Sequence, residues 1–261
     1  MNSTKITTGM ANQAIPFSIS SSTDLVGAGK SLKKSMSMGS RMTYSRLIGA
    51  LFLLGFLSYG VGNALVASVT DAPDFLSTIS AHQTTLVLGA FLMLLNSVVD
   101  IGKGVLFFPI LERHSKRTAL AYLAAMIVEV VLLAVGVLGL LMIVPLAQQG
   151  VDAGQASAGW ATALGSLGVQ WNTMAYQIAE MALGLGGDFL CSLLYRTRLI
   201  PRLLAGWGVV GYAILMAGFI AEIFGIHIGL IFSIPGGLFE LALGIWLLIK
   251  GFQPEAYGQD A

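Results

Sequence analysis

The sequence predicts an all-α, polytopic membrane protein with six transmembrane helices in one bundle and both termini in the cytoplasm. Of its 261 residues, 56% are hydrophobic and 10% are charged, whereas soluble domains carry about 25% charged residues. Six apolar stretches approach the roughly 20 residues that a helix needs to cross a hydrocarbon core of about 30 Å. The connections that contain Lys or Arg alternate with connections that contain neither.

The same composition excludes several classes of protein. A net charge of +1 creates no overall field that would attract nucleic acid. The single cysteine, Cys191, cannot form an internal disulfide or a cysteine-rich metal site. Global disorder requires low hydrophobicity and high charge, which is the opposite of this composition.

We expect residues 1–40 to form a disordered, mildly basic cytoplasmic tail. This segment is rich in Ser, Thr, Gly and Asn, and it contains no apolar run as long as a signal-peptide core. Asn2 stands where N-myristoylation requires Gly. A six-helix transmembrane domain over residues 41–252 and a short cytoplasmic tail over 253–261 complete the expected organisation.

The six apolar stretches are predicted to be helices. They lack the period-two alternation of barrel strands, and a long segment in lipid must satisfy its own backbone hydrogen bonds. The predicted spans are Leu47–Val69, Thr85–Ile110, Leu120–Leu146, Met174–Tyr195, Leu203–Phe224 and Ile228–Ile249.

The charges in the connections predict the orientation. Connections 70–84, 147–173 and 225–227 contain no Lys or Arg. The basic residues of the other flanks and connections are Arg41, Arg46, Arg113, Lys116, Arg117, Arg196, Arg198, Arg202 and Lys250. The positive-inside rule therefore places both termini in the cytoplasm. The cluster Arg196, Arg198 and Arg202 either only sets this orientation or also binds anionic lipid headgroups.

The connection 147–173 is expected to be a loop rich in Gly, Ala and Gln. Its Trp160 and Trp171 either lie at the level of the outer headgroups or pack in an ordinary surface turn. The loop divides the chain into two three-helix halves, between which no convincing match of residues is visible.

Ionisable residues within the spans are the informative ones for function. Asn96, Asp100 and Lys103 are spaced i, i+4 and i+7, so they share one face of the second helix. Polar side chains on four other helices are expected at a similar depth: Glu129, Asp188, Tyr212 and Glu240. Glu180 and Glu222 lie nearer the ends of their spans and are expected to be hydrated interfacial carboxylates.

Each charge at a helix centre costs about 2.5–3.5 kcal/mol on insertion scales, so these charges must be paired, protonated or hydrated. Lys103 can compensate one or two carboxylates, which leaves an excess of acid. Either a polar cavity binds a cation, a proton or a cationic ligand, or a buried network of ion pairs fixes the helix register.

Two glycine clusters accompany the predicted polar layer, at 184–187 and 236–237, the second directly after Pro235. Proline removes a backbone donor and glycine permits close approach. The last span is therefore either broken at Pro235, as in discontinuous transporter helices, or only mildly kinked within tight packing.

No motif for a cofactor, a metal or a common catalytic mechanism is present, because HExxH, GxSxG and P-loop patterns are all missing. All three histidines fall in predicted connections, and Cys191 has no histidine nearby that could activate it. The remaining enzymatic hypothesis is an intramembrane protein with a catalytic pair of aspartates, Asp100 and Asp188.

Several segments resemble a known family. RLIGA at residues 46–50 opens the first span, and the second span has a central acid, Asp100. The clearest segments are LLYRTRLIPRLLAG at 193–206 and ELALGIWLLIKG at 240–251. Over about residues 41–252 the chain thus resembles the bacterial integral membrane family called domain of unknown function 4386. The resemblance implies a protein of the bacterial inner membrane with no settled activity, and it supplies no catalytic residue.

The leading functional hypothesis is a transporter-like or ligand-sensing core. Its cation-binding or proton-binding acids would be Asp100, Glu129, Asp188 and Glu240, with Lys103 as the tethered counter-charge. The alternative is a non-catalytic scaffold or accessory subunit whose polar layer only fixes packing. A pocket that reaches Asp100 and Glu240 from one end favours the first hypothesis, whereas a dry network with every polar atom paired favours the second.

Overall fold

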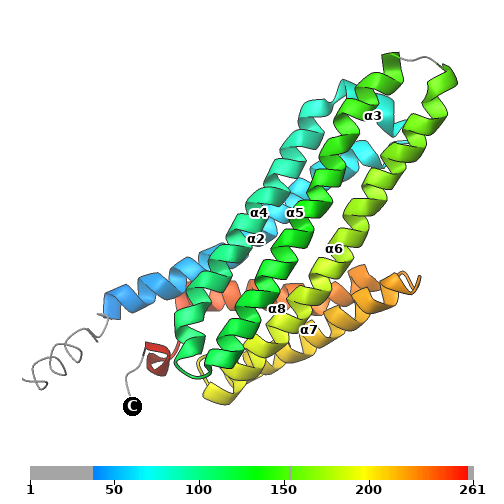
Figure 1. Ribbon diagram of the computed structural model, residues 1–261. Coiled ribbons are helices and arrows are strands. Elements are labelled where there is room, and N and C mark those ends of the chain that lie inside the picture. Colours follow the sequence, from blue (N-terminus) through cyan, green and yellow to red (C-terminus); the bar gives the residue numbers. More distant parts are fainter. Residues whose placement is uncertain (1–37, 153–154, 258–261) are drawn as a thin grey trace, which may run out of the picture. The chain divides into compact units, whose positions relative to one another are not determined.

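The structure, a computed structural model, describes residues 38–152 and 155–257 (Figure 1). Within these ranges it contains seven α-helices, one short 3₁₀ helix and no strands. The helices are α2 (Met38–Thr70), α3 (Phe75–Ala81), α4 (Gln83–Glu112), α5 (Lys116–Asp152), α6 (Gln155–Thr197), α7 (Arg202–Ile223) and α8 (Gly229–Ile249), followed by η1 (Pro254–Tyr257). The predicted all-α fold class is confirmed, while the predicted disorder of the N-terminal tail concerns residues that lie almost entirely outside the described ranges.

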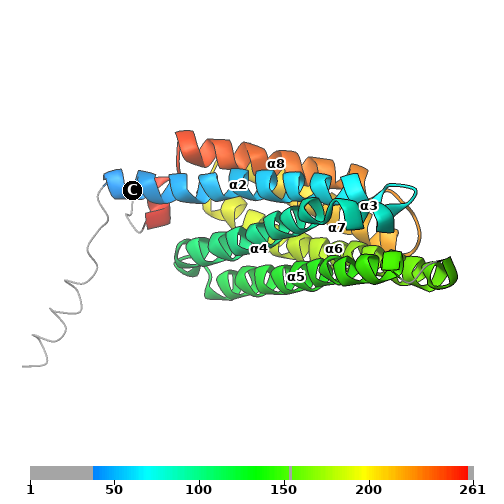
Figure 2. The ribbon, with the colours of Figure 1, turned by 90° about the horizontal axis from the view of Figure 1, so that it is seen from above.

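The six long helices form a closed ring. Each packs along the next in the sequence, from α2 through α4, α5, α6 and α7 to α8, and α8 then packs against α2. Figure 2 shows α8 and α2 side by side. All six are long and apolar enough to cross a membrane. In a bilayer this arrangement leaves an interior that all six helices enclose and an outer surface in contact with lipid.

The expected loop over 147–173 is wrong, because almost all of this segment is helical. α5 continues to Asp152 and α6 begins at Gln155. With 43 residues, α6 extends for about 65 Å, roughly twice the thickness of a hydrocarbon core. The fall in hydropathy near 147 marks the end of the apolar run, whereas the many Ala and Gln residues of the segment still favour helix. The short helix α3 was likewise not predicted.

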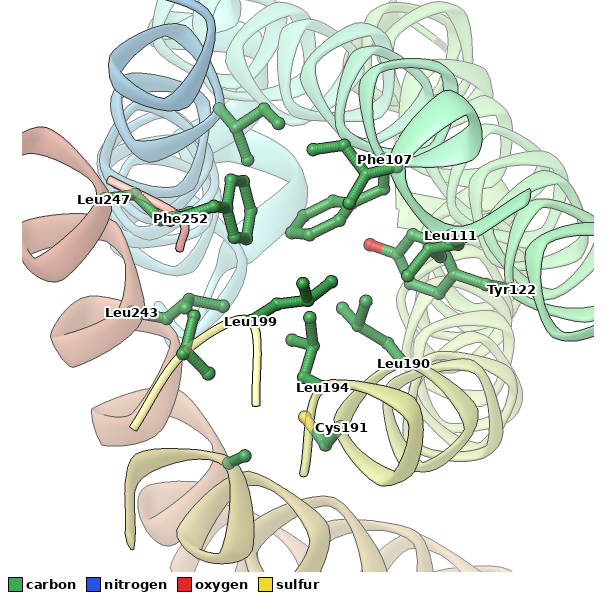
Figure 3. Close-up of a cluster of buried hydrophobic side chains, with 14 of the residues drawn as sticks. Phe107, Leu111, Tyr122, Leu190, Cys191, Leu194, Leu199, Leu243, Leu247 and Phe252 are labelled. Atoms are coloured by element: carbon green, nitrogen blue, oxygen red, sulfur yellow. The ribbon is translucent and has the colours of Figure 1, made fainter. Parts of the chain in front are cut away.

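Buried apolar side chains gather in two clusters at opposite ends of the ring. One cluster lies beside the connections that contain Arg and Lys, which we call the basic end (Figure 3). At its centre the ring of Phe107 makes edge contacts with Phe52, Tyr122 and Phe252. The other cluster joins α2, α3, α4 and α5 at the opposite end, and its buried residues are Val66, Val69, Ile79, Leu86, Ala90, Met93, Val137, Leu140, Ile143 and Ala147.

The segment after α8 packs back onto the basic end. Phe252 belongs to the buried cluster and Ala256 of η1 is also buried. The backbone N–H of Gln253 donates to the Leu199 carbonyl over 3.0 Å, and the Tyr257 hydroxyl donates to the Arg41 carbonyl over 3.0 Å. Partial burial raises the pKa of the Tyr257 phenol, so it remains a protonated donor at neutral pH. Residues up to Tyr257 are thus part of the packed domain.

Helix α8 is continuous through Pro235, so the predicted alternative of a broken last span is wrong. The indole N–H of Trp207 on α7 donates to the Pro235 carbonyl over 3.1 Å. At the start of α8 the Glu222 carboxylate accepts the backbone N–H of Gly229 over 2.8 Å. Glu222 therefore binds the first turn of α8 in addition to lying near the end of α7.

Helices α2 and α8 approach closely where Gly49 and Gly244 face each other. A Cβ atom at Gly49 would lie 2.6 Å from the Gly244 carbonyl oxygen and 3.0 Å from the Leu248 nitrogen. These neighbours are backbone atoms, so they cannot be displaced by a change of rotamer. The glycine at position 49 is therefore required by the distance between the two helix axes.

Substitution of Gly49 by Ala is expected to lower the free energy of unfolding by roughly 1–3 kcal/mol, because the added methyl group forces α2 and α8 apart. The measurement is unfolding of the purified protein in detergent. Gly60→Ala on the same helix is the matched control, since a Cβ atom there meets nothing within 4 Å. Equal losses in the two variants would contradict the packing argument.

Candidate functional site

The interior of the ring contains a cavity of about 300 Å³ to which all six long helices contribute. Its wall combines carboxylates, amides and tyrosines with apolar side chains. The lining residues are Gly55, Phe56, Tyr59, Gly60, Asn63, Asn96, Asp100, Lys103, Glu129, Leu133, Tyr176, Glu180, Leu183, Leu215, Ser233, Gly237 and Glu240.

Lys103 of α4 is buried at the basic end of the cavity. Its ammonium lies 2.6 Å from Asp100 Oδ1 and 4.0 Å from Glu240 Oε2. The same ammonium lies 4.7 Å from the centre of the Phe52 ring, at the edge of the basic-end cluster. One buried cation thus connects an acid on its own helix with an acid on α8.

Two neutral side chains complete the shell around these acids. The Asn96 amide donates to Asp100 Oδ2 over 2.7 Å, one helical turn away on α4. The Tyr212 hydroxyl of α7 donates to Glu240 Oε1 over 2.8 Å. Each carboxylate therefore has a neutral donor in addition to the ammonium, as a buried ion pair requires.

Two further acids line the cavity without contact to Lys103. Glu129 of α5 is only 3% exposed, and its Oε2 atom has no hydrogen-bond partner among the described residues. Glu180 of α6 is bound by the hydroxyl of Tyr176, one turn away on the same helix. The wall therefore contains four acids and one lysine, so its formal charge is negative when all five groups are ionised.

A stack of two tyrosines crosses the interior between helices that are not neighbours in the ring. Tyr59 of α2 and Tyr176 of α6 stack with their ring centroids 5.3 Å apart and their planes 17° apart. Phe219 of α7 packs edge-on against Tyr176 at 5.5 Å. The acids of the wall thus lie beside aromatic faces.

The structure brings together most of the predicted site residues. Five of them line the cavity, namely Asn96, Asp100, Lys103, Glu129 and Glu240. Tyr212 lies directly behind Glu240. Asp188 is the exception, because it is half-buried on α6 and does not line the cavity. At 3.6 residues per turn it is rotated by roughly 80° around the helix from Glu180, which does line the cavity.

Sequence reasoning missed Glu180 and the two stacked tyrosines. Glu180 was expected to be interfacial because the predicted span began at Met174, whereas α6 is already helical from Gln155. Spacing contained a usable signal: Tyr176 and Glu180 on α6, like Tyr59 and Asn63 on α2, are four residues apart and share a helix face.

The cavity is closed at the basic end and open on the flank of α2. The cluster around Phe107 fills the basic end of the ring (Figure 3). Lys103 lies against Phe52 at the edge of this cluster. On α2 the lining residues Phe56, Gly60 and Asn63 are exposed, so the cavity reaches the outer surface there. The helices of the second apolar cluster are α2 to α5, and α7 and α8 contribute nothing to it. The opening therefore lies beside α2 and α8, away from the basic end.

Comparison with known proteins identifies a family but no characterised relative. The model of a family described as domain of unknown function (DUF4386) matches residues 47–251. This match confirms the resemblance that the sequence predicts. Comparison with curated proteins gave no match, and comparison with solved structures gave none either.

Replacement of Lys103 by Met is expected to lower the free energy of unfolding by about 3–5 kcal/mol, because Asp100 and Glu240 would lose their buried cation. Addition of Asp100→Asn should restore part of this loss, since one uncompensated charge is then removed. A double-mutant cycle on unfolding in detergent measures the coupling. Additive losses from the two substitutions would show that the residues do not interact.

Proposed function

Because the chain belongs to the family described as domain of unknown function (DUF4386), for which no activity is stated, we propose its function from the cavity. The proposal is that the cavity binds a positively charged species, a proton or a cation, at its acidic wall. Glu129 would hold the charge of the ligand, while Asp100 and Glu240 complete the acidic wall with Lys103 as their tethered counter-charge. Such a core belongs to a transporter or a ligand sensor.

The single observation that carries the proposal is the state of Glu129. Its Oε2 atom is buried and without a hydrogen-bond partner among the described side chains, although it borders a cavity that reaches the outer surface. An ionised carboxylate without a partner costs several kcal/mol in such a place. A proton or cation that enters through the opening removes this cost.

Lys103 does not provide this compensation, because it is already bound between Asp100 and Glu240. The scaffold alternative requires a dry network in which every polar atom is paired. An open cavity and an unpaired oxygen of Glu129 support ligand binding instead. Asp188, which the sequence places among the binding acids, has no part in the proposed site because it does not line the cavity.

The orientation and location of the site form part of the proposal. Six apolar helices make the chain a multi-pass membrane protein in contact with lipid. We place it in the bacterial inner membrane with the basic end in the cytoplasm, because the Arg and Lys of the connections gather at that end. The opening of the cavity then lies in the half of the membrane away from the cytoplasm.

Substitution of Glu129 by Gln is expected to abolish the stabilisation that cations give to the purified protein in detergent. A ligand at a hundredfold excess over its dissociation constant raises the free energy of unfolding by about 2.7 kcal/mol. The unfolding temperature is therefore measured against sodium chloride, potassium chloride and tetraethylammonium chloride, and against falling pH.

Asp188→Asn is the matched control for Glu129→Gln, because it removes a half-buried carboxylate outside the cavity. Salt effects on exposed charges are common to all three proteins and cancel in the comparison. If Glu129→Gln and the unsubstituted protein respond equally to every cation and to pH, the cavity does not bind a positive charge at this acid.

We also propose that the basic end binds an anionic lipid headgroup. A second pocket, of about 410 Å³, lies at the connection between α6 and α7 and is lined by Arg198 and Arg202. The Arg202 guanidinium stacks on the Tyr195 ring at 5.6 Å, which restricts its orientation. Arg196, the third residue of the predicted lipid contact, does not line this pocket.

The combined substitution Arg198→Gln and Arg202→Gln is expected to weaken the stabilisation by phosphatidylglycerol relative to phosphatidylcholine. A loss of about 1 kcal/mol per arginine is the scale expected for basic residues at an anionic surface. The measurement is thermal unfolding in mixed micelles. Arg113→Gln, in another basic connection, is the control, and equal effects of lipid on both variants would contradict a specific site.

A further inference from the structure

We propose that the positively charged species is an organic ammonium ion with an apolar skeleton, held by Glu129 and Glu180 beside the stacked rings of Tyr59 and Tyr176. This inference rests on the proposed function and names its ligand class. It is carried by the chemistry of the wall, by the position of the tyrosine stack and by the place where the cavity opens.

The wall is suited to a ligand that is charged at one end and apolar elsewhere. Besides its acids, it contains Phe56, Leu133, Leu183 and Leu215. Inorganic cations such as Ca²⁺ take six to eight oxygen ligands, which apolar side chains cannot supply. An organic ammonium ion instead places its charge against carboxylates and its carbon skeleton against leucine and phenylalanine. A volume of about 300 Å³ lies at the lower end of the range for small-molecule sites.

The aromatic rings supply the second element of recognition. Cations bind to the faces of Tyr and Phe rings within about 6 Å of the ring centre, and quaternary ammonium groups are bound in this way by aromatic cages. Both Tyr59 and Tyr176 line the cavity, and Glu180 lies one turn from Tyr176. An ammonium group beside this stack thus has a ring and a carboxylate within reach.

Lys103 determines which acids the ligand uses. Its ammonium compensates Asp100 and Glu240 and repels a second cation from that end of the cavity. Glu129 makes no ion pair with Lys103, and its unpartnered Oε2 atom is buried at the wall of the cavity. The ligand charge is therefore directed to Glu129 and Glu180, on the side that carries the tyrosines.

The opening indicates how such a ligand arrives. Phe56 is 44% exposed, and the neighbouring lining residues Gly60 and Asn63 are also exposed on the outer surface of α2. In a bilayer this flank of a transmembrane helix faces lipid, and α8 contributes Ser233 and Gly237 to the same cavity. An ammonium ion with an apolar skeleton partitions to the membrane interface and enters sideways between α2 and α8. A strongly hydrated inorganic ion does not follow this route.

The test is calorimetric titration of the full chain in detergent with tetraethylammonium chloride. Sodium chloride tests for an inorganic ion, and triethylmethanol, a neutral alcohol of similar shape, tests for apolar binding alone. We expect saturable binding of tetraethylammonium and none of the other two. Equal binding of sodium overturns the organic ligand while leaving the proposed function intact, whereas absence of any response to cations or pH overturns both.

Two ring substitutions test the tyrosines. Tyr59→Leu is expected to weaken tetraethylammonium binding by roughly 3- to 30-fold, which is the range of a cation–ring contact. Tyr59→Phe retains the aromatic face and should bind within about twofold of the unsubstituted protein on the same scale. Retained affinity in Tyr59→Leu overturns the role of the ring.

A second pair of variants decides the question if Tyr59→Leu does not fold. Glu180→Gln removes the charge beside the stack with little change in shape, and it should weaken binding of tetraethylammonium. Asp188→Asn, on the same helix but outside the cavity, should leave the affinity unchanged. Equal affinities of these two variants overturn the assignment of Glu180 to the ligand.

Discussion

The interior of this protein is organised around one buried ammonium group. Lys103 lies 2.6 Å from one carboxylate and 4.0 Å from another, and the aromatic ring of Phe52 packs beside it. In a membrane interior, an isolated charge of either sign costs several kcal/mol, so neither partner tolerates the loss of the other. The ion pair thus connects α4 with α8, which are not neighbours in the ring. Lys103 also marks the boundary between the apolar cluster at the basic end and the polar cavity.

The sequence predicts much of this arrangement because the membrane restricts the possibilities. The length and hydropathy of the apolar stretches predict the number and position of the spans. The helical period of 3.6 residues predicts that one face carries Asn96, Asp100 and Lys103. The predictions are wrong where hydropathy does not indicate how far a helix extends or which way a side chain faces. α6 continues as a helix beyond the apolar run, so the depth of Glu180 was misjudged. Depth alone predicts Asp188 as a site residue, whereas its rotation around the helix turns it away from the cavity.

The two ends of the ring differ in what fills them. At the basic end, side chains from all six long helices and the segment after α8 close the interior with aromatic and aliphatic contacts. At the opposite end, the buried residues of the apolar cluster come from α2 to α5, and Val169 of α6 packs against them. Figure 1 shows α7 and α8 running at an angle to α5 and α6. The polar wall of the cavity is therefore accessible from the flank of α2 and not from the basic end. Which helices share a cluster could not be read from the sequence, because every span has apolar residues on all faces.

The apolar cluster around Phe107 also has an electrical consequence. A plug of packed phenylalanine and leucine side chains has a low dielectric constant and excludes ions, so part of the voltage across the membrane falls over the plug. Moving one elementary charge through 100 mV changes its energy by about 2.3 kcal/mol. Lys103, at the boundary of the plug, therefore lies within the membrane field, and a change in voltage acts on its ion pairs with Asp100 and Glu240.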